Sequence, residues 1–142
     1  MKKTQLLNAS VSRIVAEMGH TDGLCIADAG LPIPVSTDFP VRIDLAVSPG
    51  VPSFLEVLRA VLSEIVVERV LMAEEIKTMN PAMWEAVCEL LKPELGAETA
   101  GGCIEYLSHE KFKKCTHETR AVLRTGECSP YSNIILYSGV AF

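Results

Sequence analysis

Two kinds of apolar pattern alternate along this chain, and their alternation restricts the fold more than any other feature. Six short β-rich runs lack helical spacing: Leu24–Ala27, Val41–Val47, Val66–Met72, Cys103–Leu107, Arg120–Arg124 and Asn133–Tyr137. Between most of them lie segments whose apolar residues recur every three or four positions. Strands that alternate with helices favour an α/β domain, in which a mainly parallel layered sheet carries helices on its faces.

Four segments carry the helical spacing. Asn8 or Ser10 can cap the first, which ends before Gly19 and has its apolar residues at Val11, Ile14, Val15 and Met18. The second lies in SPGVPSFLEVLRAVLSEI, and the last is the short stretch HEKFKKC. The third begins at Asn80-Pro81, and we expect its inward face to contain Met83, Trp84, Val87, Cys88, Leu90 and Leu91.

Length and charge narrow the class of protein. The 142 residues most simply form a single domain, 1–142. A net charge of -5 argues against a nucleic-acid binder, which normally carries a basic face. No apolar run approaches the roughly 20 residues of a membrane span, and the segment after the two N-terminal lysines is too polar for a secretory signal. We therefore expect a cytoplasmic protein.

Several common kinds of site are absent from the sequence. There is no GxxxxGK[ST] or GxGxxG, which disfavours nucleotides, and no GxSxG or HExxH. The five cysteines are widely spread and form no CxxC pair, which argues against a disulfide framework or a zinc site.

Polar side chains flank the first strand. Asp28 follows it directly, at the carboxyl end, where parallel-sheet proteins gather their functional groups. His20 precedes the same strand, and about five residues of strand span roughly 17 Å. If both act at one site, either the loop folds back or two subunits share the site. The alternatives are structural: Asp22 can bond its own backbone in a surface turn around His20, and Asp28 can cap the turn at GLPIP.

Two further clusters offer polar groups. In SHEKFKK, His109 and Lys113 share a helix face, although Ser108 could simply cap a solvated helix there. In GECSPYSNIIL, three residues with hydroxyl or amide groups precede an apolar strand, as in polyol-binding sites and in ordinary turns: Tyr131, Ser132 and Asn133. Glu74 and Glu75 follow another strand and are either catalytic carboxylates or, more simply, a solvated strand end.

Taken together, these motifs closely resemble the D-ribose pyranase family of ribose mutarotases, which is related to the fucose mutarotases. The matching pieces run from end to end of the chain: LNASVSRIVAEMGHTD, DAGLPIP, GVPSFLEVL, AEEIK, HEKFK, RTGECSPYSNIIL and SGVAF. The GLPIP turn and the GECSPY approach favour ribose over fucose. One departure is Asp38-Phe39-Pro40, which makes the segment after GLPIP longer than the family pattern and affects the shape of that loop.

The resemblance implies a cofactor-free isomerase that interconverts the pyranose and furanose forms of D-ribose. It also implies ring-shaped homo-oligomers, pentamers that can stack into decamers, with sites between neighbouring subunits. His20 would then be the proton donor, and the residues that hold the sugar would be Asp28, His109, Tyr131, Ser132 and Asn133, with Lys113 as a further neighbour. Two alternatives stay open: an L-fucose mutarotase, and a non-catalytic ribose-binding accessory of a sugar transporter.

Overall fold

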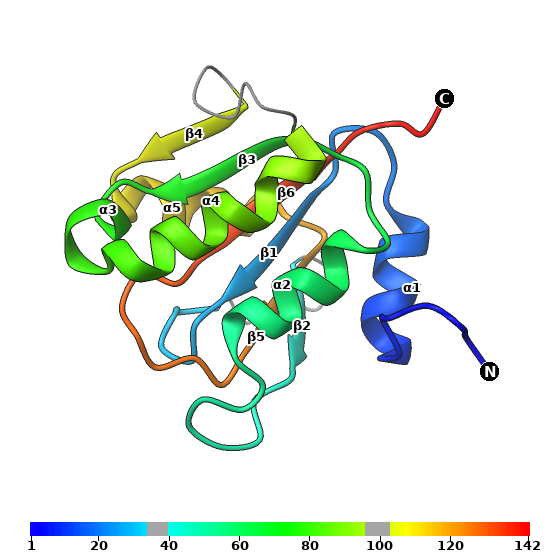
Figure 1. Cartoon of the computed structure of the whole chain (residues 1–142), viewed down its shortest axis with the longest axis horizontal. Coiled ribbons are helices and arrows are strands. Elements are labelled where there is room, and N and C mark those ends of the chain that lie inside the picture. The colour runs from blue at the N-terminus through cyan, green and yellow to red at the C-terminus, as the bar shows by residue number, and fades with distance from the viewer. Residues whose placement is uncertain (34–39, 96–102) are drawn as a thin grey trace.

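The computed structural model describes residues 1–33, 40–95 and 103–142, and one six-stranded sheet forms its centre (Figure 1). The strands are β1 (Gly23–Ala27), β2 (Val41–Asp44), β3 (Val67–Ala73), β4 (Ile104–Leu107), β5 (Ala121–Arg124) and β6 (Ile134–Ser138). The helices are α1 (Ala9–Glu17), α2 (Phe54–Leu62), α3 (Ile76–Met79), α4 (Pro81–Leu95), α5 (His109–Cys115) and a 3₁₀ turn, η1 (Thr116–Glu118).

Five of the six strands run in the same direction, in the sheet order β2-β5-β1-β6-β3-β4. The exception is β6, which lies in the middle and is antiparallel to both neighbours, β1 and β3. The link from β5 to β6 is too short for a parallel crossover, which needs a dozen or more residues. The mainly parallel α/β sheet is confirmed. Its functional consequence is that the carboxyl ends of the parallel strands meet the start of β6 at one edge.

Local capping explains where the first two long helices begin. The Asn8 side chain accepts from the Val11 N–H at 3.0 Å, so Asn8 rather than Ser10 is the cap of α1. In α2, Ser53 and Glu56 form a capping box: the Ser53 hydroxyl accepts from the Glu56 N–H, and the Glu56 carboxylate accepts from the Ser53 N–H. Two otherwise unsatisfied N–H groups are thus bonded at this helix start.

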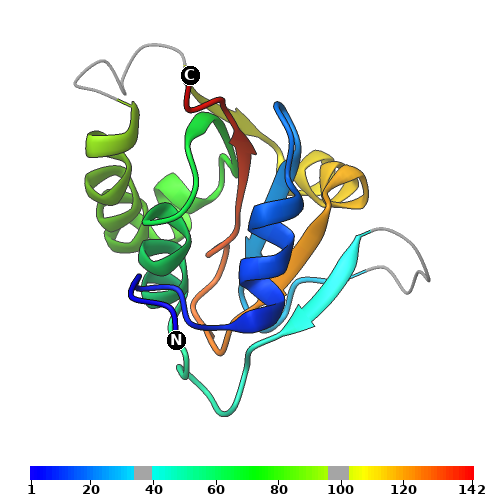
Figure 2. The same cartoon turned by 90° about the vertical axis from the view of Figure 1, so that its right-hand side faces the viewer.

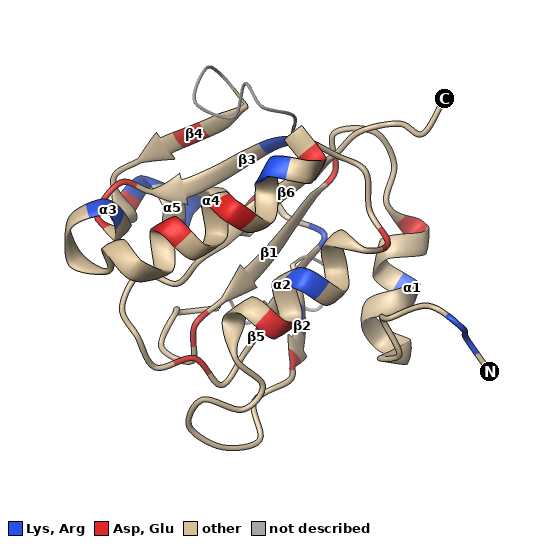
Figure 3. Cartoon of the chain, in the orientation of Figure 1, with Lys and Arg blue, Asp and Glu red and all other residues tan. Residues whose placement is uncertain are grey.

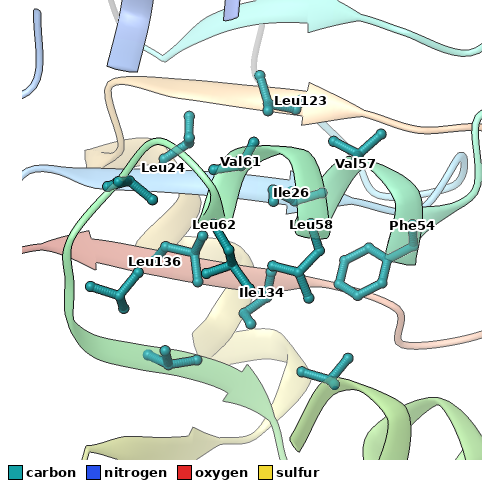
Figure 4. Packing of buried hydrophobic residues seen from close by; sticks show 14 of the residues in the cluster. Leu24, Ile26, Phe54, Val57, Leu58, Val61, Leu62, Leu123, Ile134 and Leu136 are labelled. Atoms are coloured by element: carbon teal, nitrogen blue, oxygen red, sulfur yellow. The ribbon is translucent and has the colours of Figure 1, made fainter. Parts of the chain in front are cut away.

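The sheet is buried on both faces. Leu24 and Ile26 of β1 pack in the cluster that also contains the apolar faces of α1, α2 and α4, whereas Cys25 and Ala27 pack on the α5 side. Figure 2 shows α2 and α4 on one side of the sheet and α5 on the other. Figure 4 shows α2 lying on β1, β5 and β6 through its apolar face. Burial on both faces explains why β1 reads as a continuous apolar run without alternation.

Several boundaries differ from those expected. The second strand ends at Asp44, because Ser48 and Val51 form a tight turn beyond it. The short helix α3 was not expected, and α4 buries fully only Val87 and Leu91 of its six proposed inward residues. Asp38 and Phe39 lie outside the described residues, so the longer segment there stays a prediction.

Charge on the surface is mixed. Both α2 and α4 carry basic as well as acidic side chains (Figure 3). None of the helices in the described part of the chain combines the length and the apolar character that crossing a bilayer requires.

Candidate active site

A pocket of about 480 Å³ lies at the edge where the parallel strands end. Three segments line it: the loop after β1, the connection between β5 and β6, and the first residue of α5. The lining residues are Asp28, Ala29, Gly30, Leu31, His109, Glu127, Cys128, Ser129, Pro130 and Tyr131. Its volume falls in the range of small-molecule sites, roughly 300–1,000 Å³. The pocket forms here because strand direction brings these segments together, not because they are close in sequence.

Asp28 is held in the pocket by Asn133. The Asn133 amide donates to Asp28 Oδ2 at 2.7 Å, and its oxygen accepts from the Asp28 N–H at 3.0 Å. The other carboxylate oxygen, Oδ1, accepts from the Gly30 N–H at 2.9 Å. Asp28 therefore both caps the turn, as the structural alternative held, and lines the pocket. Asn133 is fully buried and reaches the pocket only through Asp28.

The Glu127 carboxylate shapes the far wall of the pocket. Oε1 accepts from the backbone N–H of Cys128 and from both the N–H and the hydroxyl of Ser129, while Oε2 accepts from the Phe54 N–H at 3.4 Å. Burial raises the pKa of Glu127, but the hydrogen bonds from Ser129, Phe54 and Cys128 outweigh it and lower the pKa below its ordinary value. Glu127 is thus an anionic anchor for the loop that carries Tyr131.

Tyr131 projects from a strained position. Its φ is 58°, in the left-handed region that bulky residues rarely adopt. The Asn80 amide fixes the surrounding loop, because it donates to the Pro130 carbonyl at 2.9 Å and to the Ser129 and Ser132 hydroxyls at 3.1 and 3.3 Å. Ser132 is fully buried and bonds within this loop, so it lies behind the pocket wall.

His109 begins α5 and contacts Tyr131 edge to face, with 5.1 Å between ring centroids. Ser108 makes no capping bond. Instead the Glu75 carboxylate accepts the His109 N–H through both oxygens, at 2.9 and 3.0 Å. Glu75 is therefore neither a solvated strand end nor a residue of the pocket wall. It ties the end of β3 to the start of α5 and so positions His109.

Lys113 lies outside this pocket. It pairs with Glu110 at 2.5 Å and borders a separate cavity of about 360 Å³ with Pro32, Ile33 and His117. Within one chain, the structure gives Lys113 no contact with the groups around Asp28.

His20 lies at the opposite edge of the sheet, before β1, as the sequence indicated. Its Nε2 is 2.7 Å from Glu68 Oε2 on β3. The turn alternative for Asp22 holds as well, since its carboxylate accepts from the Gly19 N–H at 2.9 Å. One chain therefore brings Asp28, His109 and Tyr131 together, with Ser132 and Asn133 behind them, and leaves His20 and Lys113 apart.

Sequence reasoning missed the roles of three residues that build the pocket: Glu75, Asn80 and Glu127. Glu75 and Asn80 act across tertiary contacts, for example the 34 residues between Glu75 and His109, whereas Glu127 bonds to the next two residues and across a tertiary contact only to Phe54. No local motif marks such a pairing. The only available signal was Glu127 itself, inside GECSPY, where a carboxylate precedes a turn rich in N–H donors.

Metal-binding groups do not gather among the described residues, where no three His, Cys, Asp or Glu side chains could hold an ion together. All five cysteines are free. Cys25 is fully buried, and burial strongly raises the pKa of its thiol, whereas Cys88 is only partly covered.

Comparison with known proteins shows which proteins this chain resembles in sequence and in structure. The chain is 54% identical over 142 residues, 100% of both chains, to "D-ribose pyranase" of Haemophilus influenzae. It is 51% identical, with the same full coverage, to the protein of that name from Pasteurella multocida. Among solved structures, "The Structure of Bacillus subtilis RbsD complexed with D-ribose" matches with a TM-score of 0.87, 43% identity and 100% of both chains covered.

A more distant structure shares the fold. It is the fucose mutarotase from Streptococcus pneumoniae in complex with L-fucose, with a TM-score of 0.80, 23% identity and 100% of both chains covered. Finally, residues 1–141 match the RbsD / FucU transport protein family, and together with the full-length relatives this match shows that the chain belongs to that family.

Proposed function

We propose that this chain is an isomerase that interconverts the pyranose and furanose forms of D-ribose. The observation that carries the proposal is the 54% identity, over every residue, to a protein named D-ribose pyranase. The 43% identical Bacillus subtilis structure is described as complexed with D-ribose, which supports the same substrate. The pocket supports it chemically, because a carboxylate, an imidazole and a phenol converge there.

The carboxylate of Asp28 is suited to binding sugar hydroxyls. Each of its oxygens accepts one hydrogen bond from the protein, from Gly30 or from Asn133, and retains further lone pairs that can accept from a hydroxyl. Tyr131 can donate or accept through its phenol, and His109 can do so through Nε2, because its Nδ1 is buried. A site that satisfies each hydroxyl rejects sugars lacking one, since a buried polar group is then left unpaired.

The reaction itself consists of proton transfers. The ring oxygen gains a proton while the anomeric hydroxyl loses one, the ring opens, and closure through a different hydroxyl gives the other ring size. His20 would donate the proton, since an imidazole changes charge near neutrality. Such a positioned acid or base typically gives about 10²–10⁴-fold acceleration. Because both steps move only protons, we propose that no cofactor takes part.

The proposed site is shared between two copies of the chain. Within one chain, His20 and Asp28 sit at opposite ends of β1, so one copy must supply the imidazole and a neighbour the pocket. A closed ring of subunits satisfies this requirement, because each copy offers both ends, and we propose a pentameric ring that can stack into a decamer. Ser132 and Asn133 would act on the sugar through the residues they support. Lys113 lies outside the pocket of its own chain, so it could approach the sugar only from a neighbouring copy.

We also propose a cytoplasmic location. All five cysteines are free although several are accessible, as is usual where thiols are kept reduced.

NMR exchange spectroscopy on D-ribose tests the function. The wild-type protein should accelerate exchange between pyranose and furanose signals, and His20→Ala should lose most of that acceleration while ribose affinity and assembly persist. His117→Ala is a matched control: this exposed histidine on η1 lies outside the pocket, so its removal should leave exchange unchanged. A wild-type protein that leaves exchange at the buffer rate would overturn the proposal and favour the transporter accessory. Faster exchange with L-fucose than with ribose would favour the fucose mutarotase.

A further inference from the structure

The turn that carries His20 is fixed to the end of β6. The Thr21 N–H donates to the Ser138 carbonyl at 2.8 Å, and the Ser138 N–H donates to the Asp22 carbonyl at 3.0 Å. Thr21 has a φ of 66°, a left-handed conformation that β-branched residues rarely adopt. Such strain persists only where the surrounding structure imposes it, and it clusters at functional sites. The backbone beneath His20 therefore has little freedom.

Glu68 reaches this turn because β3 is irregular beside it. Val67 pairs with Ser138 and Arg69 pairs with Tyr137, so β3 has one residue more than β6 at this point, and that residue is Glu68. A β-bulge of this kind redirects a side chain, and bulges are over-represented next to active sites. Gly139 follows β6 here, and a Cβ on it would lie 3.4 Å from the Cβ of Glu68.

The contact between the two side chains is short and specific. His20 Nε2 lies 2.7 Å from Glu68 Oε2, a distance typical of charge-assisted hydrogen bonds. An ionised carboxylate only accepts, so Nε2 carries the proton in this bond, and Nδ1 is left to exchange a proton with another group. The His20 side chain is 53% exposed, which leaves its ring open to a ligand.

Two further ion pairs lie beside this contact. Arg120 Nε lies 3.5 Å from Asp22 Oδ2. Arg69, on β3, lies 3.0 Å from Glu105 on β4 and stacks 3.6 Å from the centroid of the Tyr137 ring. Glu68 is thus the carboxylate that the geometry assigns to His20.

We infer that Glu68 is a positioning residue for His20, an inference that rests on the function proposed above. An imidazole on an exposed turn rotates about its side-chain bonds, whereas proton transfer needs it within hydrogen-bond reach of the sugar in one orientation. The bond to Glu68 restricts that rotation and keeps the proton on Nε2. A carboxylate orients the catalytic histidine of Ser-His-Asp triads in the same way.

Three variants test this role: Glu68→Ala, Glu68→Gln and Glu105→Gln. Glu68→Ala should lower the saturated ribose exchange rate at least about tenfold, because the positioned imidazole accounts for about 10²–10⁴-fold of the rate. Ribose affinity measured by calorimetry, the melting temperature and the oligomeric state should stay as in the wild type, since Glu68 is exposed and touches His20 rather than the pocket. Glu68→Gln keeps an acceptor without the charge and should restore part of the rate.

Glu105→Gln is the matched control, because it removes a carboxylate from the same edge that also makes a 3.0 Å ion pair but does not contact His20. It should leave the exchange rate unchanged. A wild-type rate in Glu68→Ala overturns the inference, and so does an equal loss in Glu105→Gln. Either result leaves the proposed function standing, whereas an inactive wild-type protein removes that function first.

Discussion

Asn133→Ala is the sharpest test of how the pocket is built. Asn133 is fully buried, and it holds Asp28 through two hydrogen bonds, one to the carboxylate at 2.7 Å and one from the backbone N–H at 3.0 Å. The variant removes both. It leaves the Asp28 N–H without its acceptor, and the carboxylate keeps only Gly30 as a protein donor.

The expected magnitude follows from those two bonds. A buried N–H that loses its acceptor costs about 1–3 kcal/mol, and a hydrogen bond to a charged group contributes about 1.5–3 kcal/mol. Asp28 is partly exposed, so water recovers some of the second term, and we expect a total loss near 3 kcal/mol. For a chain of this size that corresponds to a melting temperature roughly 10 °C lower. Ribose affinity should fall by up to about tenfold, because binding must then order an unheld carboxylate at a cost of about 0.5–1.5 kcal/mol.

The assay is thermal and chemical denaturation at one fixed protein concentration, combined with ribose calorimetry. Asn8→Ala serves as the control, because this asparagine caps α1 far from the pocket and its loss should cost about 1 kcal/mol with ribose affinity intact. Asn133→Ala would refute the reasoning if it bound ribose as the wild type does, or if it lost no more stability than Asn8→Ala. Either result would mean that Asp28 keeps its position without the buried amide.

Two further substitutions test the pocket wall. Tyr131→Phe keeps the edge-to-face contact with His109, so the free energy of unfolding should change by less than about 0.5 kcal/mol. Ribose affinity measured by calorimetry should fall, because the phenolic hydroxyl is lost. Unaltered affinity would show that the phenol does not reach the sugar. The pKa of Glu127 lies below its ordinary value, because hydrogen bonds to its carboxylate outweigh the effect of burial. The ionised carboxylate therefore stabilises the fold fully above the unfolded-state pKa, and this stabilisation is lost as the pH falls through the lower, folded-state pKa. Melting temperatures measured from pH 7 to pH 3 should therefore decline less in Glu127→Gln than in the wild type, and parallel curves would contradict the assigned role of this carboxylate.

The expected structure matches the observed one where the interactions are local in sequence, and differs where they join residues far apart in sequence. The stretch HEKFKKC forms α5 with the bounds read from its sequence, and the apolar spacing of Val11 and Ile14 marks the buried face of α1. These features depend on residues within one or two turns of each other. The second strand was expected to be longer because Leu45 to Val47 are apolar, and the turn at Ser48 to Val51 ends it earlier.

The site could be predicted only in part, because several of its contacts join residues that are far apart in sequence. Asp28, His109 and Tyr131 were recognisable as candidates, but nothing in the sequence indicated that Glu75 and Asn80 support them, and Glu127 was marked only by its place in GECSPY. Glu75 acts from another element on the start of α5, and Asn80 does so on the loop before β6. Glu127 lies in that loop itself, where it bonds to Cys128 and Ser129, and its one distant partner is the Phe54 N–H.

The sequence alone determined the alternation of strands and helices and the residue types able to handle a polyol, because both rest on local backbone preferences and side-chain chemistry. Only the tertiary structure decided that β6 runs antiparallel through the centre of the sheet, which carries Tyr131 and Asn133 to the edge where Asp28 ends its strand. It also decided that a bulge in β3 turns Glu68 toward His20, since pairing between distant strands depends on how the whole sheet packs.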